Sequence, residues 1–302
     1  MNWIRKLWIF CGLLVLLALC YELATRIHQY SQEKVRAEAE KMALYAQLMN
    51  KPPWLSKEIL DRIISETEAF ASRDQATYNR LANPLDKEIL AEVAANYTNH
   101  LARNENAWIK QIAQVRRSID KIHQTQTIEI DAEYRKPAAW VLAHGKCYLI
   151  DEELMRLPND YSEAYRKAIG GGAGLMAITG LHEEAPEVGG RFEGADLAAG
   201  MKLAKLLRGK KFAAQIDAID MNNFNGRKDH NASWIVLNTV WTRPDGGGPR
   251  VVLWGRTPGE EKFWGISTAA KMKVLEDIYM KFNRIDAGRD CVDIQMDHVT
   301  VK

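Results

Sequence analysis

Apolar and polar positions alternate along residues 108–151, and this period of two predicts four short strands in the middle of the chain. The pattern is clearest at residues 125–134, where Ile128 and Ile130 fall on the opposite face from two carboxylates. The other three strands are expected at residues 108–116, 138–143 and 147–150.

Pro137 lies between the second and the third of these strands. Proline has no N–H to donate to a ladder, so it suits a sheet edge or a junction between domains. The whole stretch carries no residue pattern that is typical of a catalytic site. We therefore expect it to act as a hinge between two small modules outside the cytoplasm.

Helical spacing of apolar residues precedes the strands. Residues 55–71 and 86–103 are predicted to form two amphipathic helices, with Ser56 as the N-cap of the first. Residues 73–83 are predicted to be a polar connection between them. Together with the strands before Pro137, these helices predict a small α+β module at residues 52–137, which begins with a helical extension.

The N-terminal region is strongly apolar. Residues 7–21 carry no charge, and the run continues to residue 24 after a single glutamate. A run of about 15–18 apolar residues is at the short end for a transmembrane helix. Arg5 and Lys6 precede it and favour a cytoplasmic tail at residues 1–6, with everything after the helix outside.

Two alternatives to this anchor fit the sequence less well. A cleaved signal peptide would need small residues at its cleavage site, and none fits well before the charged stretch that begins at Arg26. A lipoprotein would need a small residue before its cysteine, but Leu19 precedes Cys20. The pattern favours an uncleaved signal anchor at residues 7–24.

Residues 25–51 are expected to form a helical stalk, because residues 30–49 are rich in strong helix formers. A coiled-coil seam against a partner is the alternative, although fewer than three heptads are present. Pro52 and Pro53 are expected to end the helix.

The second half of the chain is predicted to be a mixed β-domain at residues 138–302 with two or more flanking helices. The helices are expected at residues 194–208 and 268–282, and a helical turn at residues 161–168. Further strands are expected at residues 175–181, 212–220, 233–242 and 250–254, with a closing strand at residues 291–301. In that closing strand, Val292, Ile294 and Met296 alternate with polar residues.

Composition adds few constraints. The 302 residues carry a formal net charge of +2, which gives no general case for nucleic acid as a partner. Four cysteines are too few for a disulfide scaffold. Cys147 and Cys291 are the two that lie outside the apolar N-terminal run; free thiols are favoured, and a bridge between them is the alternative.

Candidate chemistry is sparse. None of the seven histidines lies in a recognisable catalytic or metal-binding motif. His182 and His230 adjoin carboxylates, but the second histidine at helical spacing that a metal site would need is missing. Residues 170–174 are glycine-rich without the flanking elements of a phosphate-binding loop, so a flexible connector is favoured. We expect no enzymatic activity, no metal, no cofactor, no small-molecule substrate and no nucleic-acid partner.

An anchored protein of this kind is expected to work by binding, and adding a strand to an open sheet edge is a recurrent way to bind. The closing strand is the natural candidate. Its inner face, formed by Val292, Ile294 and Met296, is expected to be core, and its backbone edge is expected to contact the partner.

Five short motifs occur in a consistent order along the chain. They are RKPAA at residues 135–139, YLID at 148–151, ITGL at 178–181, LWGR at 253–256 and CVDIQ at 291–295. With these motifs and the N-terminal anchor, the chain resembles the FtsQ/DivIB family of bacterial division proteins over about residues 85–302. Members of that family have a cytoplasmic tail, one membrane helix, a POTRA module and a β-domain.

The resemblance implies a non-enzymatic role. The protein would be a single-pass protein of the cytoplasmic membrane that scaffolds the division septum and binds small coiled-coil proteins of the FtsB/DivIC and FtsL type. It also implies a junction between modules at Arg135 and Pro137. The implied partner contacts on the closing strand are Val292, Ile294, Gln295, Met296, His298 and Val299.

Several features depart from the family pattern. Gln295 stands where the family usually has arginine, and residues 161–174 resemble an insertion. Residues 25–80 are longer than the usual approach to a POTRA module, and they contain no identifiable first strand for it. The main alternative function is a membrane-anchored, POTRA-containing assembly or secretion factor that is not tied to division; an enzyme outside the cytoplasm is a third.

Overall fold

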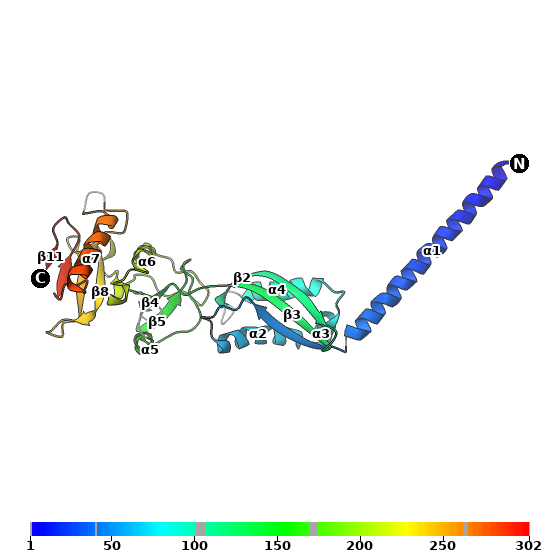
Figure 1. The fold of residues 1–302 in the computed structure, drawn as a ribbon, viewed down its shortest axis with the longest axis horizontal. Helices are drawn as coiled ribbons and strands as arrows, with labels where there is room; N and C mark the ends of the chain where they lie inside the picture. The colour runs from blue at the N-terminus through cyan, green and yellow to red at the C-terminus, as the bar shows by residue number, and fades with distance from the viewer. Residues whose placement is uncertain (1, 40, 101–106, 170–173, 262–264, 302) are drawn as a thin grey trace. The chain divides into compact units, whose positions relative to one another are not determined.

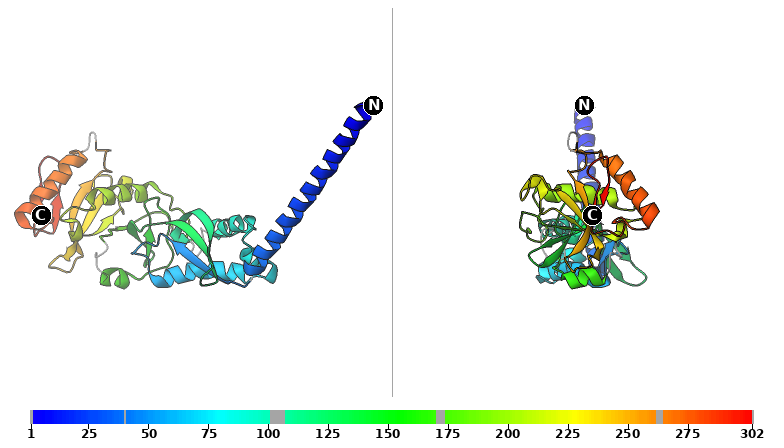
Figure 2. Two further views of the ribbon diagram at one scale, coloured as in Figure 1. Left: turned by 45° about the vertical axis from the view of Figure 1, so that its right-hand side comes forward. Right: turned by 90° about the vertical axis from the view of Figure 1, so that its left-hand side faces the viewer.

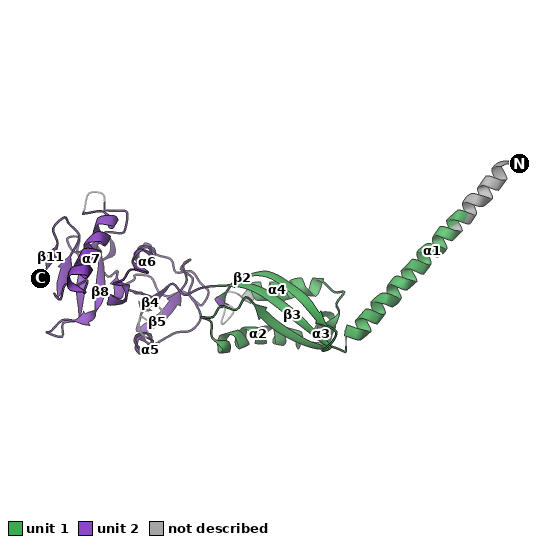
Figure 3. Ribbon diagram, viewed as in Figure 1, with its two compact units in different colours: residues 1–99, 109–134 green, residues 100–108, 135–302 purple. Residues whose placement is uncertain are grey.

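The computed structural model describes residues 2–39, 41–100, 107–169, 174–261 and 265–301; the side chains of residues 2–12, 15, 66 and 100 lie outside this description. The protein is α+β, with seven α-helices, a three-stranded mixed sheet and an eight-stranded mixed sheet in the described part of the chain. It divides into two compact units, which Figure 3 distinguishes by colour. Unit 1 comprises residues 1–99 and 109–134, and unit 2 comprises residues 100–108 and 135–302.

Unit 1 contains four helices and the three-stranded sheet. In chain order its elements are α1 (Asn2–Ala39), β1 (Ala43–Met49), α2 (Lys57–Ala71), α3 (Gln75–Ala82), α4 (Glu88–His100), β2 (Ile109–Asp120) and β3 (Thr125–Tyr134). The strand order is β1–β3–β2, with β1 parallel to β3 and β2 antiparallel to it. The predicted bounds of β3 are confirmed, and so is the burial of Ile128 and Ile130 on one face.

The prediction of a continuous helix to residue 49 is wrong. Helix α1 ends at Ala39, and residues 43–49 form strand β1, which pairs with β3 from Ala43 opposite Thr125. The buried side-chain amide of Gln126 donates to the carbonyl oxygens of Ala39 and Ala82, both at 2.9 Å. Leu48 is completely buried. These tertiary contacts outweigh a local preference for helix, which amounts to only a few tenths of a kcal/mol per residue.

The connection predicted at residues 73–83 is instead the short helix α3. Asp74 caps it, because its carboxylate accepts a hydrogen bond from the N–H of Thr77 at 2.7 Å. Leu81 and Ala82 at its end are buried. The predicted N-cap of α2 is confirmed, since the hydroxyl of Ser56 accepts from the N–H of Ile59.

The core of unit 1 lies between its helices and one face of its sheet. Ile89, Val93 and Tyr97 of the predicted apolar face of α4 are buried, whereas residue 101 lies outside the described part of the chain. The Tyr97 hydroxyl donates to the carbonyl oxygen of Ile63 at 3.0 Å, and it also contacts the Thr67 hydroxyl. These hydrogen bonds satisfy a polar group inside the core.

Unit 2 is built on the eight-stranded sheet. Its elements are β4 (Ala139–Ala143), β5 (Lys146–Ile150), α5 (Glu163–Ala168), β6 (Ala177–Thr179), α6 (Ala195–Leu207), β7 (Ile216–Asp220), β8 (Ile235–Thr242), β9 (Pro249–Gly255), α7 (Thr268–Phe282), β10 (Cys291–Asp293) and β11 (Thr300–Val301). The strand order is β11–β10–β9–β8–β7–β6–β4–β5. Figure 1 labels β4, β5, β8 and β11 of this sheet. The predicted strands at residues 138–143 and 147–150 form a hairpin, β4–β5, and its turn has His144 and Gly145 both at positive φ, as a tight hairpin turn requires.

Helices α6 and α7 cover the same face of this sheet. In α6, Gly200 lies so close to Ile178 of β6 that a Cβ atom at residue 200 would be 2.9 Å from its side chain. In α7, the ammonium of Lys271 lies 5.2 Å from the ring centre of Trp254 on β9. Figure 2 shows α7 beside the last strands of the sheet. The predicted bounds of α7 are confirmed.

The strand order of the sheet excludes a disulfide between Cys147 and Cys291. Cys147 lies on β5 and Cys291 on β10, six positions apart in the strand order, which corresponds to roughly 29 Å at about 4.8 Å per strand. A disulfide requires the two Cα atoms to lie within about 7 Å. Both cysteines are free thiols, and Cys147 is buried.

The predicted membrane anchor falls within α1. Arg5, Lys6 and residues 7–12 lie outside the described side chains. In the part of the chain whose side chains are described, no helix combines the length and the apolar character that crossing a bilayer requires.

Candidate functional site

The two edges of the eight-stranded sheet differ. At the β5 edge, a following segment pairs with the strand: the N–H of Leu157 donates to Leu149, and Cys147 and Tyr161 exchange two backbone hydrogen bonds of 2.8 and 2.9 Å. At the other edge, β11 has a neighbouring strand on one side only within the described residues. Because an edge strand presents unpaired N–H and C=O groups, β11 is the edge at which another chain could add a strand.

The closing strand predicted at residues 291–301 is a hairpin. Strand β10 runs parallel to β9 and ends at Asp293, and β11 returns antiparallel to β10. The Asp293 carboxylate accepts a hydrogen bond from the N–H of Gln295 at 2.9 Å, which is the geometry of a turn started by aspartate. Apolar residues continue to alternate with polar ones through residues 294–296. This alternation therefore predicted a strand at residues where the backbone bends.

Two glycines allow the turn after β10 to pack closely against the rest of unit 2. Gly255 has φ +93 and Gly265 has φ +149, and both face Gln295. A Cβ atom at residue 265 would clash with the carbonyl oxygen of Gln295, which accepts a hydrogen bond from Ile266 N at 3.0 Å. These contacts fix the start of the hairpin relative to β9.

A row of apolar side chains crosses the sheet from one edge to the other. Neighbours in the register of successive strands are Tyr148, Val141, Ile178, Ile219, Leu237, Val252, Val292 and Val301. The six middle residues are 0% exposed, whereas Val301 on β11 is 49% exposed. The apolar row therefore ends at β11 on a side chain that is about half exposed.

The residues predicted to contact a partner fall into two groups. Val292 and Ile294 are completely buried, which confirms the expectation that they belong to the core. Met296, His298 and Val299 are exposed on the turn, so Met296 is not part of the core as expected.

Gln295 is half-buried between these groups, and its side-chain amide lies 3.2 Å from the Asp293 carboxylate. Val301 was not predicted as a candidate contact residue. The alternation of Val299 and Val301 with polar neighbours is the signal that could have identified it.

The predicted junction residues have structural contacts within unit 2. The Arg135 guanidinium lies 2.6 Å from the Asp151 carboxylate and 3.1 Å from that of Glu153, and its backbone N–H donates to Trp108. Asp151 also accepts hydrogen bonds from two backbone N–H groups of the turn that follows β5. Arg135, the first residue of the second segment of unit 2, is therefore held to Asp151 at the end of the β4–β5 hairpin. Pro137 lies two residues later, just before β4.

A buried ion pair lies beside the candidate edge. Lys271 at the start of α7 and Glu261 are both buried, and the ammonium and carboxylate lie 3.7 Å apart. Burial lowers the pKa of Lys271, and the nearby Glu261 carboxylate opposes this shift. Glu261 also accepts hydrogen bonds from Thr268 and from the N–H of Gly259. The pair therefore fixes the first turn of α7 and is not accessible to a ligand.

The other polar groups considered from the sequence do not form a recognisable centre. His182 and Glu183 are exposed, with 3.8 Å between imidazole and carboxylate. Among the residues that the structure describes, no group of three His, Cys, Asp or Glu side chains is arranged to hold a metal ion.

Comparisons with known proteins leave the family open. No model of a known protein family matches the chain, and no curated protein matches it significantly.

Proposed function

We propose that the protein is a bitopic scaffold of the bacterial division septum, which binds small coiled-coil division proteins through contacts outside the cytoplasm. The partner adds an extended segment to strand β11, the edge strand of unit 2. The observation that carries this proposal is the open β11 edge, at which the buried apolar row ends on the exposed Val301.

The exposed side chains of the hairpin support a protein partner. Met296, Val299 and Val301 are 57%, 42% and 49% exposed, and they lie within six residues of one another. Strand addition derives its affinity from main-chain hydrogen bonds, and side-chain pockets of this kind give specificity. The covered β5 edge makes β11 the favoured site.

Unit 1 supplies a feature of the family that was not identifiable in the sequence, namely a first strand for the POTRA-like module. The resemblance implies a module that begins with a strand, and β1 supplies a strand ahead of the helices and the β2–β3 hairpin. We therefore take unit 1 after α1 as the POTRA-like module and unit 2 as the FtsQ-type β-domain. The apolar residues 7–24 would anchor the chain in the cytoplasmic membrane, with Arg5 and Lys6 on the cytoplasmic side.

A fluorescent fusion of the full chain tests this function in the host cell. The proposal predicts that the fusion gathers at midcell before constriction, and that depletion of the protein gives filaments or failed constriction. An even membrane signal throughout the cell cycle would contradict a septal role and would favour an assembly or secretion factor.

A second experiment tests the partner surface itself. Met296→Glu places a charge on the exposed turn, so we expect it to reduce recovery of the coiled-coil partner in co-purification. Val240→Glu is a matched control, because Val240 is an exposed residue on β8 of the same sheet, away from the β11 edge. Unchanged recovery with a folded Met296→Glu protein would remove the turn from the interface.

A further inference from the structure

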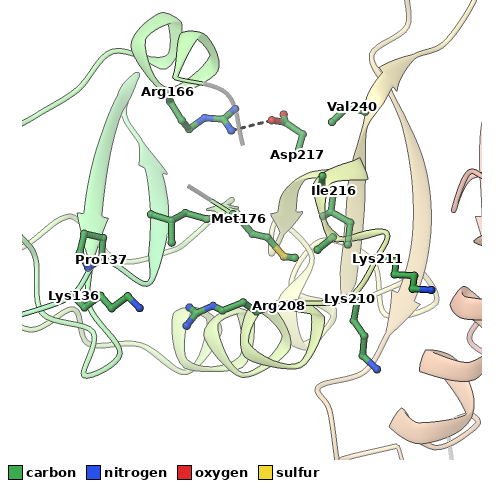
Figure 4. A pocket seen from close by; sticks show the side chains of 15 residues that line it. Lys136, Pro137, Arg166, Met176, Arg208, Lys210, Lys211, Ile216, Asp217 and Val240 are labelled. Atoms are coloured by element: carbon green, nitrogen blue, oxygen red, sulfur yellow. Dashed lines mark hydrogen bonds and ion pairs between the residues drawn. The ribbon is translucent and has the colours of Figure 1, made fainter. Parts of the chain in front are cut away.

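Unit 2 contains a cavity with a strongly basic lining. Its volume is about 410 Å³, and its walls come from α5, the segment between α6 and β7, the segments that lead into β4 and β6, and residues of β7 and β8 (Figure 4). The cationic side chains that line it are Lys136, Arg166, Arg208, Lys210 and Lys211. Asp217 is the one acidic residue among its described lining residues, so the lining carries a formal charge of +4.

Two of the five cations are neutralised from outside the cavity. Arg208 pairs with Glu152 at 2.9 Å, and Lys210 pairs with Glu276 at 2.8 Å. Neither of these carboxylates lines the cavity. Both are about half exposed, so solvent weakens their effect on the potential inside it.

Arg166 forms a fixed wall of the cavity. Its side chain is 93% buried, and its guanidinium lies 2.9 Å from the Asp217 carboxylate, as Figure 4 shows. Its Nε and Nη2 atoms have no hydrogen-bond acceptor of good geometry among the described residues. Nη2 lies 3.8 Å from the Glu163 carboxylate, and the guanidinium also interacts with the Cys147 thiol, where it opposes the rise that burial causes in the pKa of that thiol. A buried guanidinium with unused donors is costly unless an anion or water accepts from it.

Lys136 and Lys211 are the uncompensated charges. Both are exposed at the rim, and neither forms an ion pair or hydrogen bond with the residues that the structure describes. In Figure 4, Lys211 extends outward from the rim. A lysine side chain has a flexible four-carbon stem, so both ammonium groups can turn toward a bound anion.

We propose that this cavity binds a phosphate-bearing anion, either a soluble phosphate compound or the headgroup of an anionic phospholipid. Guanidinium and ammonium groups together give the charge-assisted hydrogen bonds that phosphate oxygens accept. A ligand with more than one negative charge matches the two uncompensated lysines, Lys136 and Lys211, better than a single carboxylate does. The apolar residues Met176, Ile216 and Val240 also line the cavity and leave room for carbon atoms next to the phosphate.

Calorimetric titration of the full chain in detergent with sodium pyrophosphate tests this site. We expect binding at low ionic strength that weakens at least about tenfold in the double variant Lys136→Ala/Lys211→Ala, because two charge-assisted contacts are lost. Both lysines are exposed, so the variant should fold. The double variant Lys228→Ala/Lys273→Ala removes two exposed lysines outside the cavity and should bind as the native protein does.

Three results would overturn the proposal. They are the absence of pyrophosphate binding by the native chain, equal affinity in the two double variants, and equal or tighter binding of citrate, which brings carboxylates instead of phosphates. A competition experiment separates the two sources of phosphate. Micelles that contain phosphatidylglycerol displace pyrophosphate if the ligand is a lipid headgroup, whereas micelles with phosphatidylcholine do not, and neither displaces it if the ligand is soluble.

This inference does not depend on the proposed septal function. The cavity residues lie on α5, on the segment that follows α6, ahead of β4 and β6, and on or just before β7 and on β8; none lies on the β10–β11 hairpin. Loss of pyrophosphate binding would therefore leave the partner edge untested, and loss of midcell localisation would leave the cavity untested.

Discussion

At the scale of single residues, the candidate edge depends on small features that bend and seat the chain after β10. Asp293 ends the strand by accepting the N–H of Gln295, and Gly265 allows the next turn to approach the same residue. Neither feature is visible in the hydrophobic pattern. His298 and Val299, which the resemblance implied as contacts, are exposed, but the hairpin on which they lie was not predicted.

Gly265→Ala tests the close packing between Gly265 and the turn at Gln295. The new Cβ would clash with the Gln295 carbonyl, so we expect the free energy of unfolding in urea to fall by about 2 kcal/mol more than in Gly246→Ala. Gly246 is a suitable control because it also has a positive φ but has open space around its Cβ position. Equal losses in the two variants would contradict the close packing of the turn.

The reactivity of Cys147 is a second test at this scale. Burial raises the pKa of its thiol, so little thiolate is present at neutral pH, and the side chain is 1% exposed. In a variant in which Cys11, Cys20 and Cys291 are replaced by serine, we expect slow labelling by iodoacetamide in the native state and rapid labelling in urea. The native rate should rise with pH, because the thiolate is the reactive form; rapid labelling at neutral pH would contradict the burial.

At the scale of elements, strong local patterns predict the helices and strands that form, whereas long-range strand pairing leaves no local pattern. The bounds of β3 and α7 follow from their alternation and their helical period. Strand β1 was missed because Ala, Leu, Gln and Met are good helix formers, and its partner β3 lies far along the chain. The strand exists because of contacts such as that of Gln126 with Ala39, which no local pattern contains.

Leu48→Ala tests the identity of β1. Leu48 is completely buried, so we expect a loss of about 2–5 kcal/mol in the free energy of unfolding. Gln47→Ala, one residue earlier and exposed, should change it by less than about 0.5 kcal/mol. A small loss in Leu48→Ala would contradict the strand and would favour the solvated stalk that the sequence predicted.

The ion pair between α7 and the loop before it gives a second test of an element. Lys271→Met leaves the buried Glu261 carboxylate without its cation, so we expect a loss of about 3 kcal/mol in the free energy of unfolding. Adding Glu261→Gln to this variant should restore part of that loss, because the uncompensated charge disappears. If the effects of the two single variants simply add, the groups are not a coupled pair.

At the scale of the whole molecule, the chain forms two compact units. Unit 1 has its own sheet and core, and unit 2 has a sheet with one covered edge and one open edge. The periodicity of the sequence predicted α+β material with helices ahead of a strand-rich second half, and the structure is α+β with two mixed sheets. The periodicity could not predict which sheet edge stays open, because that depends on where residues 155–161 pair with β5.

Site-specific photo-crosslinking in cells tests the central claim most directly. A photoreactive amino acid at Val301 should crosslink the full chain to a small coiled-coil division protein, because Val301 is exposed on the open edge strand. The same amino acid at Val240, an exposed residue of β8, should give no such product. Crosslinks to that partner from Val240 but not from Val301, or from neither position, would contradict the assignment of β11 as the binding edge.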